Sequence, residues 1–386
     1  NFNISLDDEN KHVPFLYWTS KQHKTPYKSR FIAGARKSTS KQISQELSLA
    51  LKCIKTQFKN YCNVIKKRTG LSYYWSIDNS SEFIDKISHV KKAYSIETFD
   101  FSTLYTNLPL DDIFKDLKLL IIKMYKNSGS SSLLVSTKRK RAFWSSGTYP
   151  ANYKIYTVDM LIDALEFVLY NTYVQFGGYL FKQILGIPMG GNASPFIADL
   201  YLAWNEYQFM HALSKSNSCL AKQLSYNSRY LDDIAVVNLK DFSGIAKSIY
   251  HHTLILEPSN TSSLNDTFLD LYIRVIDMKF LIGIYHKVDD FNFEVISFPF
   301  PESNIQSIVG YNTFYSQLIR FYRLCNNRID FMVRVQLTYR KLHSRGYDHG
   351  KLFRKFMKFC RNYAVCQKYG VSESTQFWTE CLNFNN

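Results

Sequence analysis

Two adjacent aspartates, Asp232 and Asp233, stand between short runs of residues that favour β-strands. Arg229-Tyr230-Leu231 precedes them and the apolar run 234–237 follows. Asp is a common turn residue, so the pair alone predicts little more than a strand, a turn and a second strand. This pattern constrains the fold, because it requires a sheet that carries two carboxylates at one end. The question is whether the turn also holds a ligand.

A third carboxylate, Asp100, ends an apolar segment that predicts a strand, with Ile96 and Phe99 among its residues. If this strand lies beside the hairpin at residues 230–237, three carboxylates converge with no bulky basic residue among them. Such a cluster is electrostatically unfavourable unless cations fill it. Two Mg²⁺ ions, or Mn²⁺ in their place, about 3.5–4 Å apart are the usual solution in enzymes that transfer phosphoryl groups in line. One ion would lower the pKa of an attacking 3′-hydroxyl, and the other would bind a triphosphate.

Between these acidic segments lies the sequence GIPMGGNASP, residues 186–195. Gly190 and Gly191 would let the backbone approach a flat ligand closely. Ser194-Pro195 predicts a helix start, with Ser194 as the cap and Pro195 presetting the backbone. The alternative is a loop that only leads the chain into a helix.

The charge of the chain favours a polyanionic partner. Lys and Arg number 48 against 32 Asp and Glu, a formal net charge of +16. Nucleic acid is favoured over an acidic membrane surface, because there is no apolar run of 18 residues and no signal-like N-terminus. The seven cysteines are scattered without a C-x-x-C pair, which indicates reduced thiols in an intracellular protein. The chain opens at Asn1 without Met, so we expect a piece of a longer product.

Periodicity places several elements along the chain. Apolar stripes predict helices that begin near Ile43, after Pro109 and over 157–171, and Gly177-Gly178 predicts the turn of a hairpin. The segment 127–149 is Ser-rich and contains the basic run Lys138 to Arg141. That run is interpreted as a solvated loop; nucleic-acid contact and nuclear targeting are the alternatives. Residues 320–368 contain thirteen Lys or Arg but only two Asp, with aromatic residues interleaved among them. This predicts a helical lobe that grips a nucleic-acid backbone, or else a plain helical domain.

Three segments, FDFSTLY, GIPMGGNASP and RYLDDI, resemble the catalytic motifs of the reverse transcriptase family, in the family's order. Within that family the chain is most similar to Penelope-like retroelement reverse transcriptases. The similarity lies in LYWTSKQHKTPYKSRFIAG, FSTLYTNLPL, FLDLYI and IYHKVDD, and it covers residues 13 to 345 approximately. The resemblance implies an α+β fold, the right-hand polymerase with fingers, a palm of antiparallel sheet and a helical thumb.

The resemblance also implies roles for individual residues. Asp100 and Asp232 would be the main metal ligands, with Asp233 nearby and the Phe101 carbonyl as a backbone ligand. Tyr105 would lie beneath the sugar of the incoming nucleotide and exclude a 2′-hydroxyl. The remaining assignments are the triphosphate clamp Lys28 and Arg30, assisted by Lys24; the nucleotide contacts Met189 and Gly190; and the primer or template contacts Tyr230, Gly191 and Ser194.

The expected domains are fingers and entry segment at 1–93, the first palm strand at 94–107, an insertion at 108–156, palm at 157–302 and a basic helical thumb at 303–386. The expected function is that of an RNA-directed DNA polymerase of a mobile element, acting in the nucleus on an RNA template, a DNA primer or target DNA, and dNTPs, with no membrane partner. The alternatives are a telomerase-like or intron-encoded reverse transcriptase, or a domesticated protein that binds nucleic acid without catalysis.

Overall fold

A computed structural model describes residues 12–21, 28–35, 38–147, 150–259, 262–291, 293 and 295–384, with Lys21 and Lys28 described by backbone alone. The chain divides into two compact units. The first comprises Asn1–Ser76, Phe99–Ile234 and Leu239–Pro258, and the second Ile77–Thr98, Ala235–Asn238 and Ser259–Asn386. No helix of the described residues is long and apolar enough to cross a membrane.

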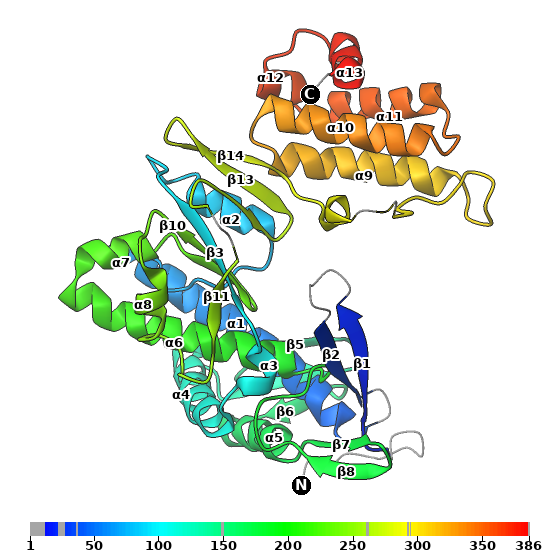
Figure 1. The fold of residues 1–386 in the computed structure, drawn as a ribbon. Coiled ribbons are helices and arrows are strands. Elements are labelled where there is room, and N and C mark those ends of the chain that lie inside the picture. The colour runs from blue at the N-terminus through cyan, green and yellow to red at the C-terminus, as the bar shows by residue number, and fades with distance from the viewer. Residues whose placement is uncertain are drawn as a thin grey trace. The chain divides into compact units, whose positions relative to one another are not determined.

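Three helices of the first unit, at residues 110–128, 158–170 and 194–216, pack against α1, which is the longest of the described helices (Figure 1). Burial of one apolar stripe explains the packing, because Ile43, Leu47, Leu51 and Ile54 of α1 are fully buried. The helices of this unit are α1 (Lys41–Thr69), α3 (Leu104–Asn107), α4 (Leu110–Ser128), α5 (Val158–Tyr170), α6 (Ser194–Ser216), α7 (Ser218–Leu224) and α8 (Phe242–Ala246). The predicted helices after Ile43 and Pro109 and over 157–171 are therefore confirmed.

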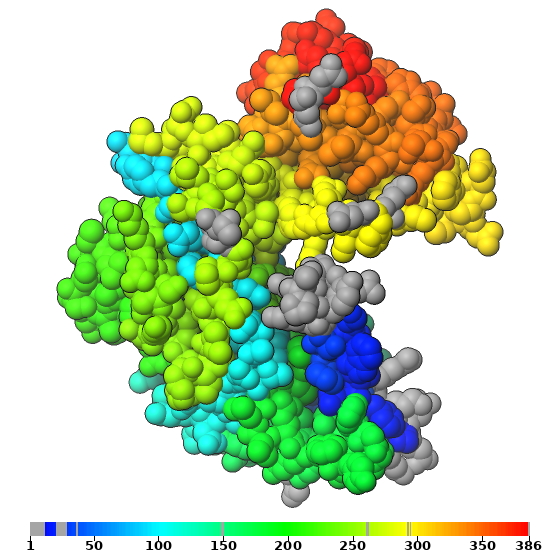
Figure 2. All heavy atoms as spheres, viewed as in Figure 1, coloured from blue at the N-terminus to red at the C-terminus, as the bar shows by residue number. Residues whose placement is uncertain are grey.

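Four sheets accompany the helices. Their strand orders are β2-β1-β7-β8, β11-β3-β10-β9, β12-β13-β14 and β5-β4-β6. Their bounds are β1 (Phe15–Lys21), β2 (Lys28–Gly34), β3 (Ile96–Phe101), β4 (Ser132–Ser136), β5 (Arg141–Ser145), β6 (Lys154–Tyr156), β7 (Tyr173–Phe176), β8 (Tyr179–Lys182), β9 (Ser228–Tyr230), β10 (Asp233–Val237), β11 (Leu256–Pro258), β12 (Asn265–Phe268), β13 (Leu271–Ile276) and β14 (Lys279–Ile284). Strands β7 and β8 form the hairpin predicted at Gly177-Gly178. Figure 2 shows β1 in blue beside β7 and β8 in green on the surface, where Phe15 pairs with Gln175.

The second unit carries α2 (Ser80–Ile87), strands β12 to β14 and a helical C-terminal part. Its last helices are α9 (Ile308–Leu324), α10 (Arg328–His343), α11 (His349–Asn362), α12 (Val365–Tyr369) and α13 (Ser374–Asn383). The predicted helical character of residues after 303 is confirmed. Buried aromatic rings form the core between these helices, with Phe331 stacked against Phe359 and Phe377. Most of the basic side chains of this helical part are exposed, but Arg345 is buried.

The basic Ser-rich loop expected within the insertion 108–156 is confined to the exposed turn at the basic run, where strand β4 leads into β5. Strand β4 pairs with β5 on one side and with β6 on the other, and all five of its residues are buried. Leu133, Leu134 and Val135 supply the apolar surface of a central strand, and the Ser132 hydroxyl donates to the carbonyl of Ser145 at 3.0 Å. A serine-rich segment can therefore form a strand, because the serine hydroxyl is satisfied by a hydrogen bond to a backbone carbonyl. Only the basic run Lys138 to Arg141 lies at the exposed turn.

Candidate active site

Asp100 and Asp232 lie at the ends of neighbouring strands in the sheet β11-β3-β10-β9. Asp100 is the fifth residue of β3, and Asp232 belongs to the turn between β9 and β10. The amide of Phe101 donates to the carbonyl of Asp232 at 3.2 Å, so one backbone hydrogen bond joins the two segments. Both carboxylate residues are half-buried. The strand of Asp100 thus lies beside the hairpin, as predicted from the sequence.

A further carboxylate, Glu257, pairs directly with Asp100 between the antiparallel strands β11 and β3. Directly opposite residues of antiparallel strands point to the same face, and like charges there destabilise the pair. A cation at this end of the sheet would relieve that repulsion. Sequence reasoning did not find Glu257, because nothing in the segment LEPSN marks which strand it pairs with.

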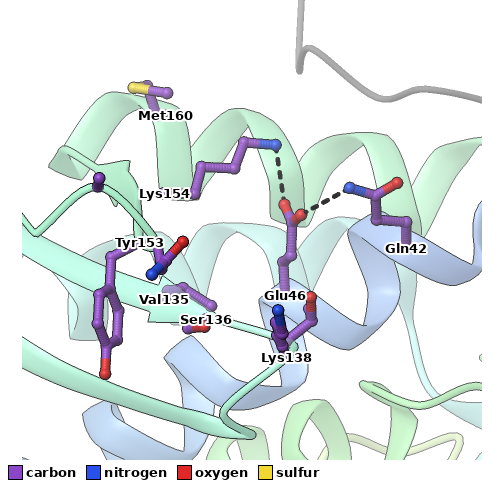
Figure 3. A pocket seen from close by; sticks show the side chains of 11 residues that line it. Gln42, Glu46, Val135, Ser136, Lys138, Tyr153, Lys154 and Met160 are labelled. Atoms are coloured by element: carbon purple, nitrogen blue, oxygen red, sulfur yellow. Dashed lines mark hydrogen bonds and ion pairs between the residues drawn. The ribbon is translucent and has the colours of Figure 1, made fainter.

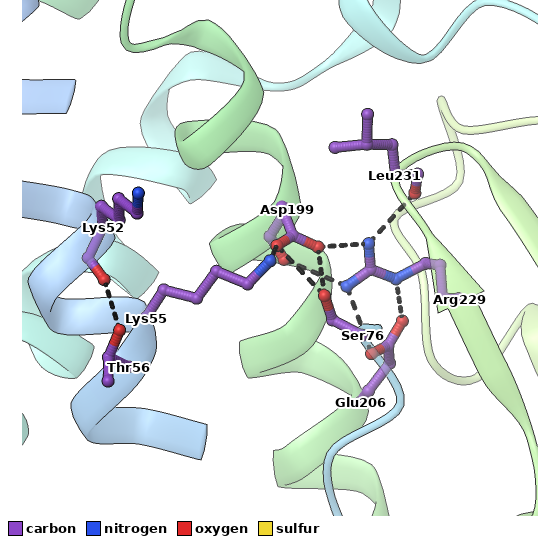
Figure 4. A network of polar contacts seen from close by, with 8 residues as sticks. All are labelled: Lys52, Lys55, Thr56, Ser76, Asp199, Glu206, Arg229 and Leu231. Atoms are coloured by element: carbon purple, nitrogen blue, oxygen red, sulfur yellow. Dashed lines mark hydrogen bonds and ion pairs between the residues drawn. The ribbon is translucent and has the colours of Figure 1, made fainter. Parts of the chain in front are cut away.

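The guanidinium of Arg229 forms a hydrogen bond with the turn that carries Asp232 (Figure 4). Leu231 has a left-handed backbone with φ of 53°, which is strained for a branched side chain. Its carbonyl accepts from Nη1 of Arg229 at 3.0 Å. The hydrogen bond therefore fixes a strained turn directly beside Asp232.

Every donor of the Arg229 guanidinium finds an acceptor, although the side chain is fully buried. Nη1 donates to Asp199 at 2.8 Å as well as to Leu231, and Nη2 donates to the Asp199 carbonyl at 3.1 Å and to Glu206 at 3.4 Å. Nε donates to the other carboxylate oxygen of Glu206. Asp199 also accepts from Ser76 and pairs with Lys55, both at 2.8 Å. Figure 4 shows these groups converging from α1, α6 and β9.

The two carboxylates of this network respond differently to burial. Burial acts to raise the pKa of Asp199, but the charges of Arg229 and Lys55 outweigh it and leave the pKa below its ordinary value. Burial raises the pKa of Glu206 despite Arg229 and the hydroxyl of Tyr250, which donates at 2.9 Å. The ring of Tyr250 meets Phe101 edge to face at 5.0 Å. The network therefore connects the turn of Asp232 to the strand of Asp100.

Tyr105 lies in α3, shortly after Asp100, among charges of both signs. Burial and the charges of Asp232 and Asp199 raise the pKa of Tyr105 to about 12, and Arg30 opposes this shift. The phenol is therefore neutral near pH 7. Arg30 is exposed in β2, opposite Thr19 of β1. The structure thus brings Tyr105, Asp232 and Arg30 into one electrostatic neighbourhood, as the sequence motifs implied.

The loop 186–191 is bound by its backbone to two of these elements. The amide of Ile187 donates to the carbonyl of Tyr105 at 2.7 Å, and the amide of Ala33 in β2 donates to the carbonyl of Met189 at 2.8 Å. A Cβ on Gly190 would lie 2.4 Å from the Ala33 carbonyl oxygen, and one on Gly186 would lie 2.4 Å from that of Tyr105. In the structure, Gly190 therefore permits close approach of the loop to the backbone of β2.

The other predicted site residues lie around this loop and the hairpin. Met189, Gly191 and Tyr230 are half-buried, and Asp233 is the first residue of β10. Ser194 is 4% exposed and begins α6 as its first residue, after Ala193. The predicted capping by Ser194 was wrong, because no side chain caps this helix start. Lys28 lies in β2, its side chain outside the described residues, as is all of Lys24.

The carboxylates of the site are oxygen donors of the kind that binds Mg²⁺. Among the residues that the structure describes, no group of three or more His, Cys, Asp or Glu could hold a metal by itself. Mg²⁺ is usually held by one or two carboxylates and completes its shell with waters and substrate phosphates. Asp100 and Asp232, on adjoining strands and half-buried, fit that pattern. The site therefore suits an ion that arrives with a nucleotide, not a protein cage.

Comparisons with known proteins show the fold and nothing finer. No protein-family model matches the chain, and no curated protein matches it. Among solved structures it is similar to telomerase from Candida albicans in complex with a TWJ fragment of telomeric RNA, with a TM-score of 0.62 at 11% identity over 97% of this chain. The RNA-dependent RNA polymerase of a human picobirnavirus has a TM-score of 0.48 at 11% identity, covering 96% of this chain and 65% of that one.

The chain spans 63% of the length of the Candida albicans telomerase chain. Because the similarity extends over nearly all of this chain, it has the right-hand polymerase fold, in a mixed architecture of helices and antiparallel sheets. The predicted fold class is confirmed.

Proposed function

We propose that the chain is an RNA-directed DNA polymerase of a retroelement, which transfers a nucleotide from a dNTP to the 3′-hydroxyl of a primer on an RNA template. The observation that carries the proposal is the series of backbone hydrogen bonds that assembles its motifs: Phe101 to Asp232, Ile187 to Tyr105, and Ala33 to Met189. Three segments far apart in sequence thereby surround the carboxylates. The polymerase fold agrees with this assignment.

In this proposal Asp100 and Asp232 hold Mg²⁺, with the Phe101 carbonyl as a further ligand and Asp233 beside them. When bound, Mg²⁺ supplies Lewis-acid stabilisation of the charge that develops on the phosphates. Arg30 binds the triphosphate through its planar fork, and Lys28 assists it. The ring of Tyr105 occupies the space that a 2′-hydroxyl would need. The residues of the chain thus position the nucleotide and select its sugar.

The decisive measurement is primer extension on an RNA template with dNTPs and Mg²⁺. Asp100→Asn and Asp232→Asn should each abolish extension, because each removes a charge that holds the cation. Asp163→Asn on the exposed side of α5 makes the same chemical change away from the site and should leave extension intact. Normal extension by the Asp232→Asn protein would refute the site. An inactive wild-type chain that binds nucleic acid would favour the domesticated binding protein.

A telomerase-like enzyme is the second candidate, favoured by the structural similarity to the Candida albicans enzyme. The Penelope-like assignment rests on the sequence segments FSTLYTNLPL and FLDLYI. Templates of several hundred nucleotides distinguish the two, since a retroelement enzyme should copy them from end to end. Repeated copying of one short template segment would favour the telomerase-like enzyme. A retroelement enzyme that acts on genomic DNA would work in the nucleus, which fluorescence microscopy of a tagged chain can test.

A further inference from the structure

The hairpin of β4 and β5 carries charge that the candidate active site does not use. Residues 129–156 contain five Lys or Arg and no Asp or Glu. Four of the five are consecutive: Lys138, Arg139 and Lys140 occupy the turn, Arg141 begins β5, and all four are exposed. None of the four forms an ion pair within the described part of the chain. The turn therefore presents uncompensated positive charge to a partner.

Aromatic rings lie directly beside these charges. Outward-facing residues alternate along β5, so that Arg141 and Phe143 are exposed while Trp144 packs on Tyr125 at 4.8 Å. Phe143 meets Tyr153 edge to face at 5.1 Å. The guanidiniums of Arg139 and Arg141 each lie 5.6 Å from the Tyr153 ring centre, and the Tyr153 hydroxyl accepts from Nε of Arg141 at 2.5 Å. Charge and ring faces thus share one surface.

Two hollows flank the turn. One, of about 550 Å³, is lined by Lys138, Asn152, Tyr153 and Lys154; the other, of about 380 Å³, by Gln57, Asn60, Arg141 and Phe143, among others. Both fall within the size of ligand pockets, about 300–1,000 Å³. The first hollow contains one acidic residue, Glu46. Its negative charge is neutralised by an ion pair with Lys154 at 2.9 Å, and Gln42 also donates a hydrogen bond to it (Figure 3). Both hollows therefore offer cationic and amide groups.

The backbone of the turn is also unusual. Lys140 has φ of 51°, in the left-handed region where Gly or Asn is ordinarily found. A Lys at such a position costs stability relative to Gly, and strained residues of this kind gather at binding sites. The strain is consistent with a turn selected for its charge.

We propose that the surface formed by Lys138, Arg139, Lys140, Arg141, Phe143 and Tyr153 is a second nucleic-acid site, which binds a single strand. The four cations contact phosphates, and an unpaired base stacks on the exposed ring of Phe143. A duplex could use the charges but not the ring, because its bases are already stacked. The amides of Gln57, Asn60 and Asn152 can contact base edges. This site lies on other elements than Asp100, Asp232 and Tyr105, so it does not depend on the proposed polymerase activity.

The test compares two variants that lose the same four charges. One replaces Lys138, Arg139, Lys140 and Arg141 with Gln, and the control replaces the exposed Lys215, Lys222, Lys240 and Lys247 of the same unit with Gln. Fluorescence anisotropy measures binding of the full chain to labelled 12-nucleotide RNA and DNA single strands and to a duplex. We expect the hairpin variant to lose tenfold or more in single-strand affinity, and the control less than threefold. Equal losses would overturn the proposal, because net charge alone would explain them.

Two further measurements locate the contact. Phe143→Ala should weaken single-strand binding about fivefold or more and leave duplex binding unchanged; an equal loss for the duplex would refute stacking. Single-stranded RNA that contains 4-thiouridine should crosslink to peptides within 137–154, in the wild-type and Asp232→Asn proteins alike. Tighter binding of RNA than of DNA would support a 2′-hydroxyl contact, and equal binding a contact through phosphates and base faces. If the hairpin variant lost binding to phosphatidylserine vesicles but not to RNA, the proposal would be wrong.

Discussion

The phenol of Tyr105 illustrates what one residue contributes to the site. Its pKa of about 12 follows from burial and from the nearby negative charges of Asp232 and Asp199. A group with this pKa remains protonated throughout the range in which polymerases are assayed. In the proposed site the ring would therefore act by its shape and not by its charge.

Replacement of Tyr105 should change sugar selection. Tyr105→Ala should lower the preference for dNTPs over rNTPs by about 10- to 100-fold, because the space for a 2′-hydroxyl opens. Tyr105→Phe keeps the ring and serves as the matched control, with selection close to wild type. The measurement is the ratio of kcat/KM for the two nucleotides, which should not vary between pH 7 and pH 9. Unchanged selection in the Ala variant would exclude the sugar-gate role.

Arg229 makes a structural contribution that can be separated from catalysis. Removal of one partner from a buried ion pair leaves an unpaired charge and costs about 3–5 kcal/mol. Arg229→Met should therefore lower the free energy of unfolding by that amount. Adding Glu206→Leu should recover part of the loss, because one unpaired carboxylate is removed. Urea denaturation of the single and double variants measures both effects; a double variant no more stable than Arg229→Met would contradict the pairing.

At the scale of elements, the loop 186–191 binds two neighbours through its backbone. Gly186, with φ of 73°, lies against the carbonyl of Tyr105, and Gly190 against that of Ala33. A side chain at either position would collide with main-chain atoms, which cannot rotate away. The loop therefore sets the distance between α3 and β2, and through them the positions of Tyr105 and Arg30.

Gly186→Ala tests this role of the loop. Its Cβ would lie 2.4 Å from the Tyr105 carbonyl oxygen, so α3 must move and primer extension should fall by tenfold or more. Gly129→Ala is the matched control: its φ is also positive, 68°, but nothing lies within 4 Å of the added Cβ. The control variant is destabilised only by the backbone strain, about 1 kcal/mol, and should keep its activity. Equal activity of the two variants would show that the close approach is not needed.

At the scale of the whole molecule, the net charge of +16 would favour the association with nucleic acid that the proposed function requires. Each phosphate that the chain neutralises releases a counterion, so affinity falls steeply with salt. If about six phosphates are contacted, the affinity for a primer–template duplex should fall roughly 10³-fold between 50 and 200 mM KCl. Filter binding across this range measures the slope of log K against log salt. An affinity that does not change with salt concentration would contradict electrostatic binding to the phosphates of the nucleic acid.

Sequence reasoning predicted the elements whose signals are local. The apolar stripe of α1, the hairpin at Gly177-Gly178 and the acidic turn at Asp232 depend on periodicity and turn preference, which neighbouring residues set. The same reasoning did not predict β4, because serine and charge content outweighed three apolar residues that become a central strand. It also assigned Ser194 as the cap of α6, whereas Ser194 is the first residue of the helix and Ala193 stands at the cap position.

The sequence by itself determined the helices and strands that have clear local periodicity, the acidic ends of β3 and the β9–β10 hairpin, and the basic character of the chain. Only the tertiary structure decided that Arg229 is buried with Asp199 and Glu206, that Glu257 faces Asp100, and that Gly190 touches Ala33. The physical reason is that backbone preferences and hydrophobic periods act over a few residues, whereas the environment of a charge depends on which distant segments pack against it. Arg229 looks like a surface residue in its own segment, and only the helix α6, 13 to 35 positions earlier in the sequence, makes it the support of the candidate site.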